Sequence, residues 1–313
     1  MKSLDKNRSF LYSWRQKGGS LWRNVVPNKK VSPAKKENPT RGEKEFSMRE
    51  VRALYQALTQ AGCVALKSNE FCEAVDKNKN GSYLIKHDIH SDLRRTFYFA
   101  EMEHDLGVNA VYFAMPEHDL SESYFGDQYM WRGFKRIVEM GHELALHLDL
   151  HQLVMRYGDL STAVRETMEI FRKEGFAIQT ANIHGNTGLR RLYGSPKALI
   201  RRMDNDTEPL KHKFPMIGSD FRKHYASLSL ETLALDHGIL NWIDSGFFRA
   251  GRNLNVAGNC TDNSGSLYYG VHGRNLLKTA PYSIDSEFTE KLVQYCRETT
   301  SLFLLHPQFY ELP

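Results

Sequence analysis

From about residue 46 onward, the chain alternates between helical and strand-like spacing of its apolar residues. In residues 47–62, apolar side chains from Val51 to Leu58 recur at helical spacing, after a serine that can cap the helix. Residues 82–89 then form a short apolar run that is typical of a buried strand. The pattern therefore predicts a helix that is followed by a strand.

The same order of strand and helix repeats to the end of the chain. Further strands are predicted at residues 108–115, 142–148, 177–185, 216–221, 238–246 and 301–307. Further helices are predicted at residues 91–107, 128–141, 159–176, 196–204 and 286–300. Strands that alternate with helices predict a parallel sheet with the helices outside it. About seven strands in this length favour one α/β domain, residues 46–313, with a (β/α) barrel fold.

Positive charge is concentrated in residues 1–45. This segment carries twelve Lys or Arg residues and four acidic residues, whereas the whole chain has a net charge of +5. We interpret it as a flexible, disordered basic tail. The alternative is a segment that contacts nucleic acid or an anionic membrane surface. The rest of the chain is net negative, which argues against a broad nucleic-acid-binding face.

The composition is typical of a soluble globular protein, with 41% hydrophobic and 25% charged residues. No apolar stretch is long enough to predict a membrane span, and the N-terminus lacks the apolar segment of a secretory signal. The four cysteines form no CxxC pair and indicate neither a disulfide framework nor a zinc finger. The predicted compartment is therefore the cytoplasm.

Residues that can bind a metal or move a proton lie at the ends of the apolar runs. They are Asp88 and His90 in one place, His147 and His151 in a second, and His306 in a third. Because the carboxyl ends of parallel strands converge on one face, we expect these side chains to lie close together. A hydrolytic site needs groups that hold an ion and a carboxylate that takes a proton from water. A metal-dependent hydrolase is the leading hypothesis.

Each of these features also has a simpler interpretation. The spacing of His147 and His151 is expected by chance in about half of such chains, and the two can be ordinary core or surface histidines. Asp88 can stabilise the N-terminus of the following helix, and His306 can hydrogen-bond to backbone at a strand end. We interpret the neighbouring His87 and His142 as structural.

Five segments, taken in order, resemble the motifs of a known enzyme family. The segments are KHDIH, GHELALHLDLH, NIHGN, NWIDSG and LLHPQ. They resemble the polysaccharide deacetylases, the NodB-homology carbohydrate esterases, and in particular a divergent branch found near bacterial surface-polysaccharide genes. The resemblance covers roughly residues 80–310. It implies a distorted (β/α) barrel and zinc-dependent removal of an N-acyl group, usually acetyl, from a sugar.

The resemblance also implies a metal site and a base. Asp88 matches the catalytic base, and His147 and His151 match the two metal-binding histidines. His90 stands where the family has an aspartate as the third ligand. Three neutral histidines and a water form a reasonable zinc site, so the resemblance implies Zn²⁺ as the cofactor.

Three further residues receive roles from the same resemblance. His184 lies where the family supplies an arginine that holds the base, so it is expected to orient Asp88. His306 matches the acid that protonates the leaving amine, and Asp244 matches the residue that orients this histidine.

Other functions stay open at this level. The same residues suit a deformylase or an amidase that acts on another small amide. Because His90 replaces the aspartate of the family, the chain can also be a catalytically inactive relative that binds a glycan or a partner protein. The expected partner is an N-acylated sugar or glycan, without a membrane span, and nucleic acid would be bound only through residues 1–45.

Overall fold

The computed structural model describes most of the chain after residue 44. The described residues are 45–90, 93–115, 128–185, 189–190, 193, 195–201, 224, 227–244, 247–249, 252–254, 256–263 and 265–312. The expected basic tail, apart from Glu45, lies outside the described residues, and so does the strand predicted at 216–221.

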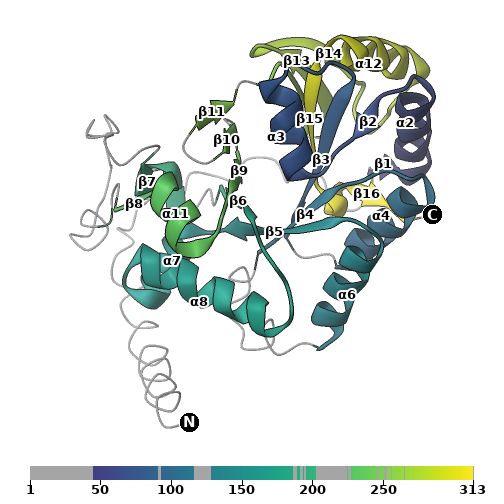
Figure 1. The fold of residues 1–313 in the computed structure, drawn as a ribbon. Coiled ribbons are helices and arrows are strands. Elements are labelled where there is room, and N and C mark those ends of the chain that lie inside the picture. The colour runs from purple at the N-terminus through teal and green to yellow at the C-terminus, as the bar shows by residue number, and fades with distance from the viewer. Residues whose placement is uncertain are drawn as a thin grey trace, which may run out of the picture. The chain divides into compact units, whose positions relative to one another are not determined.

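A mostly parallel sheet organises the fold (Figure 1). Its strands are β2 (Val64–Ala65), β3 (Ser82–Ile89), β4 (Val111–Ala114), β5 (Glu143–Leu148), β6 (Thr180–Ile183), β9 (Asn241–Ile243), β10 (Phe247–Arg249), β11 (Arg252–Leu254), β12 (Gly258–Asn263), β13 (Ser266–Val271), β14 (Arg274–Lys278) and β15 (Thr300–Leu305). All neighbours in the order β9, β6, β5, β4, β3, β15, β12 are parallel. Antiparallel strands extend both ends of this order. The predicted α/β fold with a parallel sheet is confirmed, and closure into a barrel stays a prediction.

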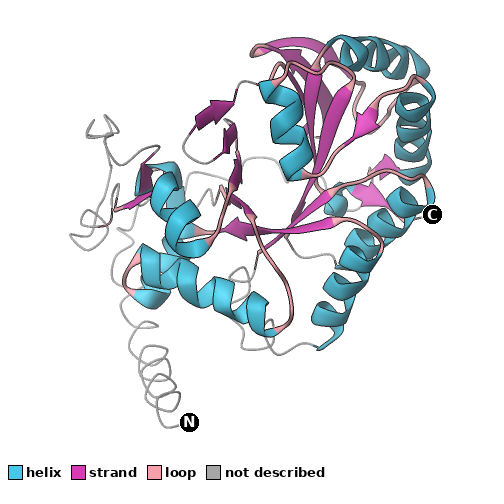
Figure 2. Cartoon of the chain, in the orientation of Figure 1, coloured by secondary structure: helices cyan, strands magenta, loops and turns pink. Residues whose placement is uncertain are grey.

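Eight α-helices of the described chain accompany the sheet (Figure 2). They are α2 (Met48–Gln60), α3 (Ser68–Asp76), α4 (Leu93–Asp105), α6 (Gln128–Glu139), α7 (Leu150–Tyr157), α8 (Leu160–Lys173), α11 (Leu230–His237) and α12 (Ser286–Glu298). The shorter elements are β1 (Phe46–Ser47) paired with β16 (Tyr310–Glu311), β7 (Ile200–Arg201) paired with β8 (Leu228–Ser229), and the 3₁₀ helices η1 (Pro196–Leu199) and η2 (Pro307–Phe309). None of the helices in the described part is long and apolar enough to cross a membrane.

Side chains of the central strands alternate between two hydrophobic cores. On β3, Tyr83 and Ile85 belong to the larger core, which also contains residues of α2, α4, α6, α8 and α12. Leu84 belongs to the smaller core, which contains residues of α3. Lys86 and Asp88 alternate in step with Leu84 and therefore lie on the face that α3 covers. This face carries the candidate site at its carboxyl end.

Capping and apolar spacing in the sequence predict α2 correctly but predict one other helix wrongly. Ser47 caps α2, because its hydroxyl accepts a hydrogen bond from the Arg49 amide at 3.3 Å, and the predicted apolar positions are buried. The helix predicted at 196–204 is wrong over its described residues. There the chain forms only η1 and then turns extended at Ile200, with φ −121° and ψ 129°. The sequence analysis also did not predict α3, α7, α11 or the strands β12, β13 and β14.

Candidate metal centre

Polar side chains meet where four central strands end. Asp88 lies near the end of β3, His147 near the end of β5, and His306 directly after β15. The pairing of β5 with β6 places Asn182 opposite His147. Alternation along β6 then places His184, two residues later, on the same face as Asn182. The predicted convergence of side chains is confirmed for Asp88, His90, His147 and His306, and His184 joins them.

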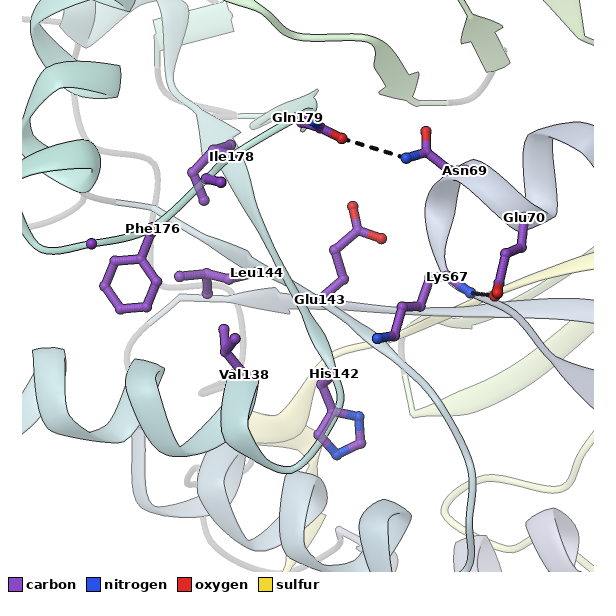
Figure 3. A pocket seen from close by; sticks show the side chains of 12 residues that line it. Lys67, Asn69, Glu70, Val138, His142, Glu143, Leu144, Phe176, Ile178 and Gln179 are labelled. Atoms are coloured by element: carbon purple, nitrogen blue, oxygen red, sulfur yellow. Dashed lines mark hydrogen bonds between the residues drawn. The ribbon is translucent and has the colours of Figure 1, made fainter.

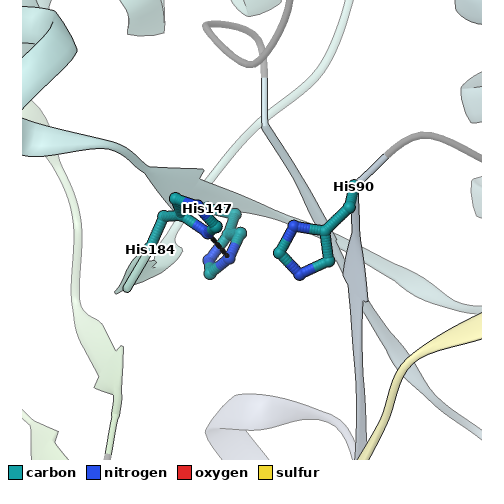
Figure 4. A group of neighbouring side chains, drawn as sticks. All are labelled: His90, His147 and His184. Atoms are coloured by element: carbon teal, nitrogen blue, oxygen red, sulfur yellow. Dashed lines mark hydrogen bonds between the residues drawn. The ribbon is translucent and has the colours of Figure 1, made fainter. Parts of the chain in front are cut away.

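Three histidines form a group that fits one metal ion. His90, His147 and His184 each present a ring nitrogen, and these atoms lie within 4.8 Å of one another (Figure 4). His184 Nδ1 and His147 Nε2 lie 3.0 Å apart. Two nitrogens that bind one tetrahedral zinc ion at about 2.0–2.1 Å are about 3.3 Å apart. The donor set and its spacing therefore fit a divalent ion such as zinc.

His151 does not join this group. A second candidate group among the described residues consists of Asp88, His90 and His306, and neither group includes His151. His147 lies on β5, but His151 lies on α7, which begins after Asp149 caps it by accepting a bond from the Gln152 amide at 3.2 Å. The chain therefore changes direction between the two histidines. His147 and His151 therefore do not share one face of a helix.

Asp88 is a buried carboxylate among cationic and neutral nitrogen groups. Its Oδ2 lies 3.3 Å from Lys86 Nζ, 3.8 Å from His147 Nε2 and 3.9 Å from His306 Nε2. Burial alone would raise the pKa of Asp88, but His147, Lys86, His306 and His90 outweigh it and lower the pKa. Asp88 is therefore ionised at neutral pH.

Asn182 holds Asp88 in place of the expected His184. The Asn182 side-chain amide donates to Asp88 Oδ1 at 3.1 Å, and its Oδ1 lies 2.6 Å from His147 Nδ1. His184 instead contacts His147. The reason is the register, because Asn182 is the residue directly opposite His147, whereas His184 follows the end of β6. The sequence analysis quoted Asn182 within NIHGN but gave it no role.

Asp262, not Asp244, orients His306. The Asp262 carboxylate lies 2.5 Å from His306 Nδ1 and accepts the His306 backbone amide at 2.6 Å. Asp244 forms an ion pair with Lys197 at 3.0 Å. The topology explains the difference, because β12 pairs with β15 whereas β9 is separated from it by β6, β5, β4 and β3.

The two histidines that face Asp88 have opposite electrostatic environments. Burial lowers the pKa of His147 to about 3, although Asp88 opposes the shift. Burial also disfavours the charged form of His306, but the hydrogen bond and charge of Asp262 and the charge of Asp88 prevail, so its pKa is raised. His147 is thus a neutral ring that can bind an ion, and His306 is suited to donate a proton.

A cavity at the opposite end of β5 and β6 does not include these residues. It has a volume of about 530 Å³ and lies at the amino ends of both strands (Figure 3). Its polar side chains are Lys67, Asn69, Glu70, His142, Glu143 and Gln179, and its apolar side chains include Val138, Leu144, Phe176 and Ile178. The Glu143 carboxylate is already engaged, because it accepts the Ser68 amide at 2.8 Å and the Thr180 hydroxyl.

Comparisons with known proteins name no family for the chain. No family model matches it, and no curated protein matches it either. The chemistry of the site is therefore inferred from its own side chains.

Proposed function

We propose that the protein is a metal-dependent hydrolase that removes an N-acyl group, in the first instance acetyl, from a sugar or polysaccharide precursor. One observation carries the proposal: three histidines are grouped beside an ionised aspartate, and His306, which is held by Asp262, faces the same carboxylate oxygen as His147. The ordered resemblance to polysaccharide deacetylases supports the substrate class.

The proposed ion is Zn²⁺, held by His90, His147 and His184. When bound, it would polarise the acyl oxygen and make the attacking water more acidic. Three neutral imidazoles leave one position of a tetrahedral zinc site for water or substrate, which is the arrangement of catalytic rather than structural zinc.

Asp88 is the proposed general base. Its Oδ1 is held by Asn182, whereas its Oδ2 faces the Nε2 atoms of both His147 and His306. Oδ2 takes a proton from the attacking water, and the resulting hydroxide oxygen bonds to the acyl carbon. Lys86 stabilises Asp88 before the proton arrives, because its ammonium is paired with the same oxygen.

His306 is the proposed general acid. Its Nδ1 is held by Asp262, so Nε2 is the atom that faces Asp88 and the reacting groups. As the carbon–nitrogen bond breaks, Nε2 gives its proton to the departing sugar nitrogen. The products are a carboxylic acid and a free amine on the sugar.

We also propose that the sheet closes into a distorted (β/α) barrel and that the enzyme acts in the cytoplasm. The run of neighbouring parallel strands from β9 to β12 supports the first proposal, because such a barrel is built from parallel strands. The four free, buried cysteines support the second, since they suit a reducing compartment.

The test combines metal content with hydrolysis. Protein purified without chelator is subjected to elemental analysis and then incubated with a panel of N-acetylated and N-formylated nucleotide sugars, while released acetate and formate are measured. We expect about one zinc per chain, acetate release that chelation abolishes and zinc restores, and no release by the Asp88→Asn protein. A preparation without bound zinc, cobalt or nickel that stays inactive when these ions are added contradicts the proposal. Release of formate alone would identify a deformylase instead.

A further inference from the structure

The side-chain amide of Asn182 lies between the proposed base and a proposed ligand. It is fully buried and contacts Asp88 on one side and His147 on the other. The Asn182 side-chain NH₂ donates to Asp88 Oδ1 at 3.1 Å. The carbonyl oxygen of the amide therefore faces His147, and an oxygen can only accept.

This arrangement decides which nitrogen of His147 carries the proton. Because Asn182 Oδ1 accepts, His147 Nδ1 must donate across the 2.6 Å contact. In a neutral ring, the lone pair is then on Nε2, the atom that lies 3.0 Å from His184 Nδ1. His184 Nδ1 is the donor in that contact when no ion is bound. The hydrogen bonds thus run in one direction, from His184 through His147 and Asn182 to Asp88.

We infer that Asn182 is a positioning residue with two separable effects on the proposed reaction. Its carbonyl fixes His147 in the tautomer that presents Nε2 to the ion, and its NH₂ holds Asp88 Oδ1 so that Oδ2 remains the proton acceptor. The inference rests on the proposed function, because it assigns the second effect to the proposed base. If His184 bound the ion through Nδ1, its proton would be carried on Nε2, whereas the tautomer of His147 would be unchanged.

Two substitutions of similar size separate the effects. Asn182→Leu removes both hydrogen bonds, and we expect zinc affinity to fall by about 10–100-fold together with turnover. Asn182→Asp keeps an acceptor for His147 but places a second carboxylate against Asp88. For that variant we expect zinc affinity within about threefold of the wild type and a fall in kcat of about 100-fold or more.

Asn241 provides a matched control. It is also a fully buried asparagine, on the neighbouring strand β9, but it bonds to Asn69 and Thr180 near the amino ends of the strands. Asn241→Leu should lower the melting temperature without lowering zinc affinity. The inference is overturned if Asn182→Leu binds zinc as tightly as Asn241→Leu, or if Asn182→Asp loses as much zinc affinity as Asn182→Leu.

A measurement on the wild-type protein does not depend on the variants folding. Long-range ¹H–¹⁵N spectra of metal-free protein with labelled histidine report the tautomer of each ring, and His147→Gln identifies the signal. We expect His147 to carry its proton on Nδ1 before and after zinc is added, whereas His184 changes. A proton on Nε2 of His147 overturns the inference. These spectra and the zinc affinities are independent of turnover, so an inactive wild type would refute the proposed function while they still decide the tautomer.

Discussion

Two buried carboxylates lie on opposite sides of β3, and both are surrounded by histidines or hydroxyls. Glu103 accepts a bond from the Tyr55 hydroxyl at 3.0 Å and contacts His87 Nε2 at 2.7 Å. Asp88, the residue directly after His87, points to the other face and contacts Lys86 and Asn182. Adjacent residues of one strand thus supply two polar networks that are separated by the sheet.

The two networks differ in what the ring nitrogens of their histidines contact. His87 uses Nε2 for Glu103 and Nδ1 for the Leu305 carbonyl at 3.1 Å, so both of its nitrogens are engaged inside the core. His147 and His306 are held through Nδ1, and both turn Nε2 toward the site, where it faces Asp88 in both cases and also contacts His184 in the case of His147. We therefore interpret the Glu103 network as structural and the Asp88 network as chemical. The spacing of histidines in the sequence does not distinguish the two.

The largest expected effect is the contrast between substituting Asp88 and substituting Glu103. Asp88→Asn should lower kcat by about 10²–10⁴-fold while zinc stays bound, because the base is lost but the three histidines remain. Glu103→Gln should instead lower the free energy of unfolding by about 1.5–3 kcal/mol, since it weakens buried hydrogen bonds to a charged carboxylate. Steady-state kinetics, elemental analysis and denaturant unfolding of both variants check this. Loss of zinc from the Asp88→Asn protein would mean that Asp88 is a ligand.

Strands were predicted correctly where a short run of apolar residues in the sequence marks them. The strand predicted at 82–89 coincides with β3, and the last strand, predicted at 301–307, overlaps β15. The role of Asp262 could not be predicted, because it depends on β12 pairing with β15, which places Asp262 against a residue 44 positions later, and because β12 has no continuous apolar run. Asn182 was missed for a similar reason, since only the register between β5 and β6 places it against His147.

The next effect separates His184, which the structure places in the ligand group, from His151, which the sequence assigned to the metal. His184→Gln should lower zinc affinity by more than about 100-fold, since losing only the hydrogen-bond partner of a ligand already costs about 10–100-fold. His151→Gln should leave zinc affinity unchanged, because His151 lies on α7 beside the Tyr193 ring and outside the ligand group. Competition titrations with a zinc indicator measure both. The opposite ranking would restore His151 as the ligand.

A smaller effect separates two aspartates. Asp262→Asn should lower kcat by about 10–100-fold and move the alkaline loss of activity to lower pH. The direction of this pH shift follows from the pKa of His306. Burial lowers its pKa, but Asp262 and Asp88 raise it further than burial lowers it. A general acid loses its proton as pH rises through its pKa, so removing Asp262 brings that loss to lower pH.

Asp244→Asn is the control for this prediction. Its carboxylate is paired with Lys197 rather than with His306, so the variant should keep the wild-type pH–rate profile. An unchanged profile for Asp262→Asn together with a shifted profile for Asp244→Asn would reverse the assignment.

The smallest effect concerns pH and the structural network. Burial would raise the pKa of Glu103 above its ordinary value of 4.5, but His87, Tyr112 and His142 prevail and lower it. A carboxyl group whose pKa is lower in the folded state stabilises the fold above its unfolded pKa, and this contribution is lost as pH falls through the folded value. The stability difference between wild type and Glu103→Gln should therefore be full at neutral pH and shrink below about pH 4.5. Denaturant unfolding from pH 7 to pH 3 measures it, and a difference that grows on acidification would contradict the ionised state of Glu103.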